Sequence, residues 1–268
     1  MNRDIYRIFR LALILGVVAF IYWPIVAVFL VAGIYDVVRQ NYNNKLQLAR
    51  QYFLVNGILT WVFSPLNLIV DVISLPFINK QIYKLEDLPE IHQNEIKRII
   101  ENCPKSHLIE SVKKAGLETG RSMLLYKWYG FNVANKYKCD LFHERFKTIQ
   151  TIGVSTFAPN TSTSRHFGWL RAGIRVLINI DEDVEESAYI EVNNQTHSWK
   201  ENGPLFIFDD TVLHQSFNKT DKNRHCLFID VTRPSLLSAV LSGLIRLLGY
   251  ASIKARILTR SSNWKVET

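Results

Sequence analysis

The stretch RHFGWLRAGIRVLINI, residues 165–180, decides the fold class of this 268-residue chain. It begins with a basic residue and a histidine and ends in an apolar run rich in β-branched residues, which is typical of a buried strand. If His166 binds a metal, a carboxylate is expected two residues later, but position 168 is glycine. The strand indicates a β domain, and the glycine raises the question of how a metal would be held.

Similar strand-like runs lie on both sides of this stretch. They are rich in β-branched and aromatic residues, and Asn, Asp, Gly and Pro separate them. The runs are TIQTIGVSTFAP, GIRVLINI, SAYIEVNN, GPLFIFDD, VLHQSFNK and HCLFIDV. They predict a mainly β chain whose core, over residues 146–234, is a barrel or sandwich of about eight strands.

Two apolar segments, residues 11–35 and 52–76, precede the β region. The first has 25 residues without a charge, which is enough to span a bilayer and more than an ordinary core helix contains. We expect a membrane anchor over residues 1–80. Either the first segment spans the membrane and the second returns the chain, or each dips in at its proline, Pro24 or Pro65, and returns to the same side. Two buried core helices are the remaining alternative.

The net charge of +8 is unevenly distributed. Residues 1–50 carry +4 and residues 233–268 carry +5, whereas residues 51–232 carry −1. Basic residues that flank apolar segments fit an anionic membrane surface better than nucleic acid, and no nucleic-acid-binding motif accompanies them.

Residues 81–145 predict a helical connector that leads into the β domain. LEDLPEIHQNEIKRIIENCP has an N-cap candidate in Asp87, a proline in its first turn and a stop at Pro104. The aromatic and apolar stretch SMLLYKWYGF follows.

Residues 235–268 form a basic, apolar tail. Arg246, Lys254, Arg256 and Arg260 are spaced along its apolar part. The pattern is typical of an amphipathic helix lying on the bilayer, and equally of a helix packed on the β domain.

Two stretches near the histidines resemble the aspartyl/asparaginyl β-hydroxylase family. They are STFAPNTSTSRHFGWLRAGIR and WKENGPLFIFDDTVLHQSFNKTDKNRHCLFIDVTRP. The second carries FDD, a histidine four residues on, an arginine ten further and a strand ending in D-V-x-x-P. The resemblance covers roughly residues 150–235. It implies an iron(II) and 2-oxoglutarate dioxygenase, with O2 as second cosubstrate, on a double-stranded β-helix (jelly roll).

The resemblance implies that His166 and His214 are the iron ligands. Family members from animals also carry glycine at the position of Gly168, which implies a two-histidine site with water in place of the usual carboxylate. Asp209 and Asp210 would either orient His214 and its loop or serve as turn residues.

The resemblance also implies three cosubstrate-binding residues, Ser155, Arg175 and Arg224. A planar guanidinium matches a carboxylate bidentately, so Arg224 suits the distal carboxylate of 2-oxoglutarate. The chain departs from the family at Leu177, where a histidine is usual.

The N-terminal half is similar to bacterial membrane-anchored lipid A hydroxylases of the same family, through LPF, INKQIYKLEDLPEIHQNEIKRII and YKWYG. This resemblance implies a lipid acyl chain as substrate, the bacterial inner membrane as location and a catalytic domain facing the cytoplasm. Ornithine-lipid hydroxylases are close relatives of that group. A peptidyl aspartyl/asparaginyl hydroxylase, a halogenase and a membrane scaffold that retains the fold are the alternatives.

Overall fold

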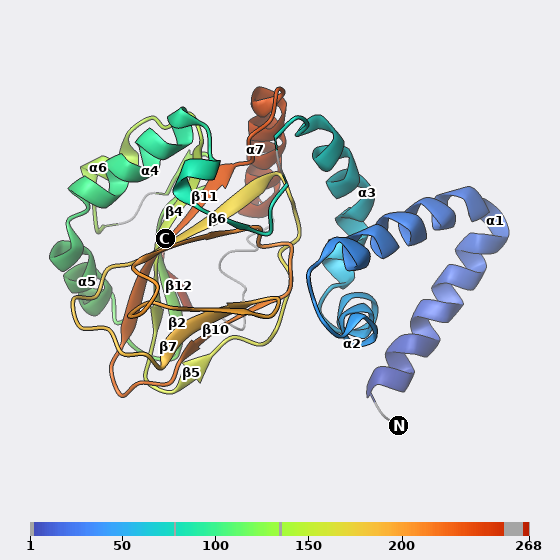
Figure 1. Ribbon diagram of the computed structural model, residues 1–268, viewed down its shortest axis with the longest axis horizontal. Coiled ribbons are helices and arrows are strands. Elements are labelled where there is room, and N and C mark those ends of the chain that lie inside the picture. The colour runs from blue at the N-terminus through green and yellow to red at the C-terminus, as the bar shows by residue number, and fades with distance from the viewer. Residues whose placement is uncertain (1–2, 78, 134–135, 255–264, 268) are drawn as a thin grey trace.

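The computed structural model describes residues 3–77, 79–133, 136–254 and 265–267. Its N-terminal helices stand on one side of a β domain (Figure 1). These helices are α1 (Arg3–Arg39), α2 (Lys45–Arg50), the π-helical turn η1 (Gln51–Val55) and α3 (Ile58–Ile73). Arg256 and Arg260 of the basic tail lie outside the described residues.

Helix α1 bends sharply in its middle (Figure 1). Tyr22 has non-helical angles, φ −142° and ψ 54°, two residues before Pro24. Proline lacks the amide hydrogen and collides with the preceding turn, so a kink at this place is expected. The segment Tyr22–Arg39 is long and apolar enough to cross a membrane.

The second apolar segment bends by 103° between η1 and α3. The bend lies at Asn56 and Gly57, and Pro65 lies inside α3 instead of at a turning point. A Cβ atom on Gly57 would overlap the backbone of Tyr52, so the tight turn requires glycine. A bend at Pro24 therefore agrees with the sequence, whereas the bend expected at Pro65 is found at the glycine.

The β domain consists of two antiparallel sheets, apart from one parallel edge pair. In the larger sheet the order is β1-β9-β6-β11-β4-β2-β12, and β3 pairs with β2. Its strands are β1 (Ile82–Tyr83), β2 (Arg121–Trp128), β3 (Phe131–Asn132), β4 (Ile149–Phe157), β6 (Gly173–Asn179), β9 (Leu205–Phe208), β11 (Arg224–Thr232) and β12 (Lys265–Glu267), which runs parallel to β2.

The smaller sheet has the order β5-β10-β7-β8. Its strands are β5 (Thr161–Ser162), β7 (Ala188–Val192), β8 (Gln195–Ser198) and β10 (His214–Asn218). One apolar cluster joins the two sheets, with Leu177, Phe208 and Cys226 from the larger and Ile190 and Val192 from the smaller. Two antiparallel sheets packed on a shared interior form the predicted jelly roll.

The six strand-like runs of the sequence form β4, β6, β7, β9, β10 and β11. The larger sheet extends beyond these runs, because β1 and β2 lie before residue 146 and β12 lies after residue 234. The predicted connector thus contributes strands to the barrel as well as helices.

The connector helices cover the outer face of the larger sheet (Figure 1). A cluster of fully buried apolar residues joins them to the strands, for example Ile96 and Leu108 with Val154 and Leu227. The remaining helical elements are η2 (Leu85–Asp87), α4 (Glu90–Asn102), α5 (Lys105–Lys114) and α6 (Asp140–His143). Successive side chains of a strand point to opposite faces of the sheet. The side chains on one face therefore pack against these helices, and those on the other face line the interior of the barrel.

The tail helix α7 (Ser238–Lys254) packs beside α3. Leu241 and Ile245 are buried against Val70 of α3 and Ala172. Its other face leaves Val240 and other apolar side chains exposed. The tail helix therefore packs on the protein through one face, and contact of its open face with a bilayer stays a prediction.

Candidate active site

His166 and His214 are brought together by backbone pairing. The loop before β6 and the start of β10 form an isolated antiparallel bridge at these two residues. Each amide donates to the other carbonyl oxygen at 3.0 Å, and the two ring centroids are 4.2 Å apart. Two histidines that are far apart in the sequence thus present their imidazoles side by side.

Both imidazoles are held in the form that suits a metal. The Nδ1 atom of His166 lies 2.8 Å from the carbonyl oxygen of Ser164, and that of His214 lies 2.9 Å from the carbonyl oxygen of Val212. A neutral ring donates its Nδ1 proton to such an oxygen, which leaves the Nε2 lone pair for a metal ion. Burial lowers the pKa of both histidines, so both rings are neutral at pH 7.

Asp210 occupies the space that a side chain at position 168 would fill. A Cβ atom on Gly168 would overlap the Asp210 carboxylate, and the Gly168 amide donates to the Asp210 carbonyl oxygen at 2.6 Å. Across the described residues, no group of three His, Cys, Asp or Glu side chains is close enough to hold a metal ion together. The site therefore consists of two histidines with a carboxylate beside them, supplied from the loop before β10.

Exchanging the carboxylate between positions 168 and 210 tests this arrangement. Gly168→Asp alone is expected to lower stability by about 1–3 kcal/mol, the usual range for overpacking. Adding Asp210→Gly removes the overlap and should recover most of that loss. Thermal unfolding of the two variants and of Asp210→Gly alone would measure this coupling, and additive effects would contradict the shared space.

Arg175 is paired with two carboxylates. Its Nη2 lies 2.9 Å from Asp210 and its Nε lies 2.5 Å from Asp230, and its guanidinium stacks on the Phe228 ring with the Cζ atom 3.7 Å from the centroid. Burial raises the pKa of Asp210 to about 7, a rise to which Asp230 adds and which Arg175 opposes. Arg175 thus fixes the position of Asp210 beside the histidines.

Unlike Arg175, Arg224 has a buried guanidinium that lacks a full set of hydrogen-bond partners. The residue is 4% exposed, and among the described residues its Nε and Nη1 atoms have no hydrogen-bond acceptor. Its Cζ atom lies 4.2 Å from the centroid of the Phe157 ring. A buried cation in this condition is costly unless an anion joins it, so the structure favours a carboxylate ligand here.

Ser155 lies close to Arg224 because β4 and β11 are paired. Ser155 is opposite Cys226, and Arg224 is opposite Phe157. The alternating pattern turns all four toward the interior. The Ser155 hydroxyl donates its single proton to the Cys226 carbonyl oxygen at 3.2 Å, so its lone pairs are open to a donor, and it can donate to a ligand only by rotating away from that carbonyl.

A single cavity of about 600 Å³ contains all of the predicted site residues in its lining. They are Ser155, His166, Arg175, His214 and Arg224. Leu177 also lines it, so the position where the family usually has histidine is apolar here. The role of Asp210 could not be chosen from the sequence. Only its position four residues before His214 indicated that it lies near the site.

A buried cluster of charged side chains connects the loops that carry His166 and His214 to the N-terminal helices. Arg171, with no exposed surface, pairs with Asp36 of α1, with Asp71 of α3 at 2.5 Å and with Asp209. Arg233 also pairs with Asp209, at 2.9 Å. Burial alone would raise the pKa of Asp209, but the surrounding guanidinium groups hold it well below its usual range.

Asp209 is therefore both a turn residue and an ion-pair partner. Its carboxylate accepts hydrogen bonds from the Thr211 amide, at 2.9 Å, and from the Thr211 hydroxyl, at 2.6 Å. It contacts the arginines of the cluster, and it shapes the loop that leads to His214. The turn-residue alternative raised from the sequence is therefore observed, and an orienting role of Asp209 toward His214 stays a prediction.

Hydrogen bonds from the N-terminal helices hold the histidine loops. Thr60 of α3 donates to the Gly168 carbonyl oxygen at 2.7 Å, and Asn67 donates to that of Trp169 at 3.0 Å. The Leu213 amide donates to the side-chain oxygen of Gln40, the residue that follows α1, at 3.0 Å. The helices expected to form the anchor thus support both loops of the candidate site.

The interior of the jelly roll presents a histidine pair and a buried arginine whose Nε and Nη1 atoms have no acceptor among the described residues, and all three residues line one cavity. The chain matches the sequence profile of the aspartyl/asparaginyl β-hydroxylase family over residues 89–234, more than half of its length. It therefore belongs to the aspartyl/asparaginyl β-hydroxylase family.

Among individual relatives, the chain is 32% identical over 92 residues to an ornithine lipid ester-linked acyl 2-hydroxylase of Rhizobium tropici. The match covers 34% of this chain and about a third, 32%, of that relative. Solved structures with some likeness include a prolyl-4-hydroxylase of Pseudomonas putida, at 15% identity and a TM-score of 0.27 over 31% of this chain and 50% of the other. A cupin-2 barrel protein of Salinispora arenicola has 13% identity and a TM-score of 0.26 over 37% and 71%.

Proposed function

We propose that the protein is a membrane-associated iron(II) and 2-oxoglutarate-dependent dioxygenase that hydroxylates a lipid acyl chain. One observation carries the proposal. The same cavity is lined by two imidazoles with free Nε2 lone pairs, by a buried arginine whose Nε and Nη1 atoms lack an acceptor among the described residues, and otherwise by largely apolar side chains. Membership of a hydroxylase family and the similarity to a lipid acyl 2-hydroxylase support it.

The residues fit iron and its cosubstrate. The Nε2 atoms of His166 and His214 would hold the metal from one side, and water would fill the position that a carboxylate at 168 would otherwise take. Asp210, fixed by Arg175, lies where it would hydrogen-bond such a water. Bound iron would supply O2 activation, so that one oxygen atom enters a substrate C–H bond while 2-oxoglutarate becomes succinate and CO2.

The protein's own groups would bind and orient the other reactants. Arg224 would take the distal carboxylate of 2-oxoglutarate in two hydrogen bonds, with the Ser155 hydroxyl donating beside it. Leu177, Phe208 and Phe228 would hold the acyl chain and exclude water from the site. The location proposed is the bacterial inner membrane, with the β domain in the cytoplasm.

Lipid analysis tests the proposal directly. Cells that express the intact chain are expected to contain a lipid one oxygen atom heavier, and cells that express His166→Ala are expected to lack it. Lipid A and ornithine lipids would be examined separately by mass spectrometry, because the two substrates distinguish the two related groups. No oxygenated lipid, with the protein folded and iron-loaded, would overturn the lipid assignment.

Arg224 is expected to control cosubstrate affinity. Hydrogen bonds to charged groups are worth about 1.5–3 kcal/mol, so Arg224→Met should raise the KM for 2-oxoglutarate about 10- to 150-fold. Steady-state succinate formation measures the change, with Arg145→Met, an exposed arginine before β4, as matched control. An unchanged KM would remove Arg224 from the cosubstrate site.

A further inference from the structure

The cavity has a buried end and a partly exposed end. Its buried lining residues, such as Ser155, His214 and Arg224, lie on barrel strands or at their ends. Many of its partly exposed ones come from elsewhere, with Phe63 on α3, Trp169 before β6 and Ala251 on α7. The cavity therefore reaches the surface between α3 and α7, the two helices that pack together through Val70 and Leu241 (Figure 1).

The walls near this opening are apolar. Phe63, Leu170 and Leu248 contribute hydrocarbon or aromatic surface. Two polar groups are paired inside the wall, because the Trp128 indole donates to the Ser252 hydroxyl at 2.8 Å and that hydroxyl donates to the Gly249 carbonyl oxygen at 2.8 Å. Such an opening suits a hydrocarbon chain better than a peptide or a sugar.

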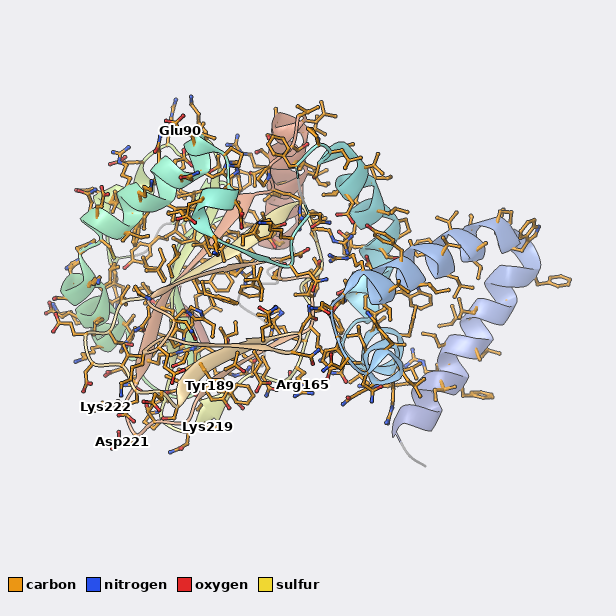
Figure 2. The ribbon with its side chains drawn as sticks, in the orientation of Figure 1. Glu90, Arg165, Tyr189, Lys219, Asp221 and Lys222 are labelled. Carbon is orange, nitrogen blue, oxygen red and sulfur yellow. The ribbon has the colours of Figure 1, made fainter. Side chains whose placement is uncertain are left out.

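Apolar surface continues outward from the opening along both helices. The exposed members are Val62, Ile69 and Val72 on α3 and Val240, Leu247, Tyr250 and Ile253 on α7. Exposed apolar side chains gathered on two neighbouring helices favour a membrane or protein contact. The charged turn before β11, with Lys219, Asp221 and Lys222, lies on the side of the barrel away from α1 and α3 (Figure 2). The opening is therefore on the apolar side of the molecule.

The aromatic motif YKWYG holds α7 in place at the opening. Tyr129 has a positive φ of 45°, a strained conformation for a residue with a side chain, and its ring stacks on Trp128 at 4.4 Å. A Cβ atom on Gly249 would come within 2.6 Å of the Tyr129 Cβ, so α7 sits directly on this turn. The wall of the opening that α7 forms is thus held in place by packing against Tyr129.

We infer that the cavity is entered sideways from the bilayer, between α3 and α7. The lipid headgroup stays at the membrane surface, and only the acyl chain passes Trp169 and Ala251 to reach the histidines. This inference rests on the proposed function and adds to it the route and the residues that select the chain.

A bulky residue at the opening tests the route. The full-length protein would be placed in phosphatidylethanolamine–phosphatidylglycerol vesicles that contain a lipid with a photoreactive diazirine in its acyl chain. Cross-linked peptides are then mapped by mass spectrometry. The intact protein is expected to be labelled on β2, which carries Met123 and Leu125 of the cavity lining, as well as on the outer faces of α3 and α7.

Ala251→Trp is expected to reduce the β2 label at least tenfold and to leave the outer label unchanged. Ile253→Trp, on the opposite side of α7 from Ala251 and outside the cavity lining, should leave both unchanged. Ala251→Leu gives a second, milder obstruction, and equal thermal stability shows that each variant is folded. An undiminished β2 label in both folded Ala251 variants would overturn the sideways route.

The labelling does not require turnover, so it separates this inference from the proposed function. If the intact protein hydroxylates no lipid while Ala251→Trp still blocks the label, the activity is wrong and the route stands. If lipid is hydroxylated equally by the intact protein and Ala251→Trp, the route is wrong and the activity stands.

Discussion

Replacing His214 by alanine is expected to abolish iron binding and hydroxylation together. The imidazole is one of only two protein nitrogen ligands that the candidate site offers within the described residues, with its Nδ1 proton fixed on the Val212 carbonyl oxygen. Loss of a mere supporting partner of a metal ligand costs about 10- to 100-fold in affinity or activity, so loss of the ligand itself should cost at least about 100-fold. Anaerobic titration of the metal-free protein with Fe(II) measures the affinity.

The matched control is His107→Ala, an exposed histidine on α5. It should bind iron like the intact protein. If His214→Ala binds Fe(II) as tightly as that control, the histidine pair is not the metal site. A loss of iron binding accompanied by a large fall in melting temperature would instead indicate damage to the fold, and His166→Ala then gives an independent test.

Replacing Arg171 by methionine is expected to destabilise the whole molecule. The guanidinium is fully buried and faces the carboxylates of Asp36, Asp71 and Asp209. Removing one partner of a buried ion pair typically costs about 3–5 kcal/mol. Arg39 and Arg233 still face Asp36 and Asp209 in this variant, so the loss is expected near the lower end of that range and comes mainly from Asp71. Arg171→Lys should lose part of this stability, since a single ammonium cannot reproduce the planar fork. Denaturant unfolding in detergent measures the difference.

Arg165→Met provides the contrast in the same loop. Arg165 lies where the β domain meets the N-terminal helices (Figure 2), half exposed, 3.6 Å from Glu191 and 3.2 Å from the Tyr42 hydroxyl. Exposed pairs are worth about 0–1 kcal/mol, so this variant should unfold almost like the intact protein. Equal effects of the Arg165 and Arg171 substitutions would contradict the role given to burial.

The β-barrel and the residues that line its interior could be predicted from the sequence, because both depend on local patterns. Alternating and β-branched runs predict strands, and the family resemblance places His166 and His214 at their edges. The structure brings these histidines together with Ser155, Arg175 and Arg224 in one cavity. Their roles there stay predictions.

The residues that hold the site loops in place could not be predicted from the sequence in the same way. Arg171 follows a tryptophan and a leucine in a loop, where an arginine is ordinarily solvated, and its three partners lie on three separate elements. The filling of the Gly168 position by Asp210 depends on the approach of two loops far apart in the chain. Such contacts depend on tertiary packing and leave no periodic signal.

The charge cluster also bears on the order in which the chain is made. The N-terminal helices leave the ribosome first. Asp36 has Arg39 beside it on α1, but Asp71 of α3 is made before Arg171 exists to neutralise it. An unpaired carboxylate is costly in an apolar surrounding, so α1 and α3 are expected to settle fully only after residue 171 has been synthesised. A ribosome stalled before that point should leave both helices accessible to protease, and one stalled well after residue 233 should leave them protected.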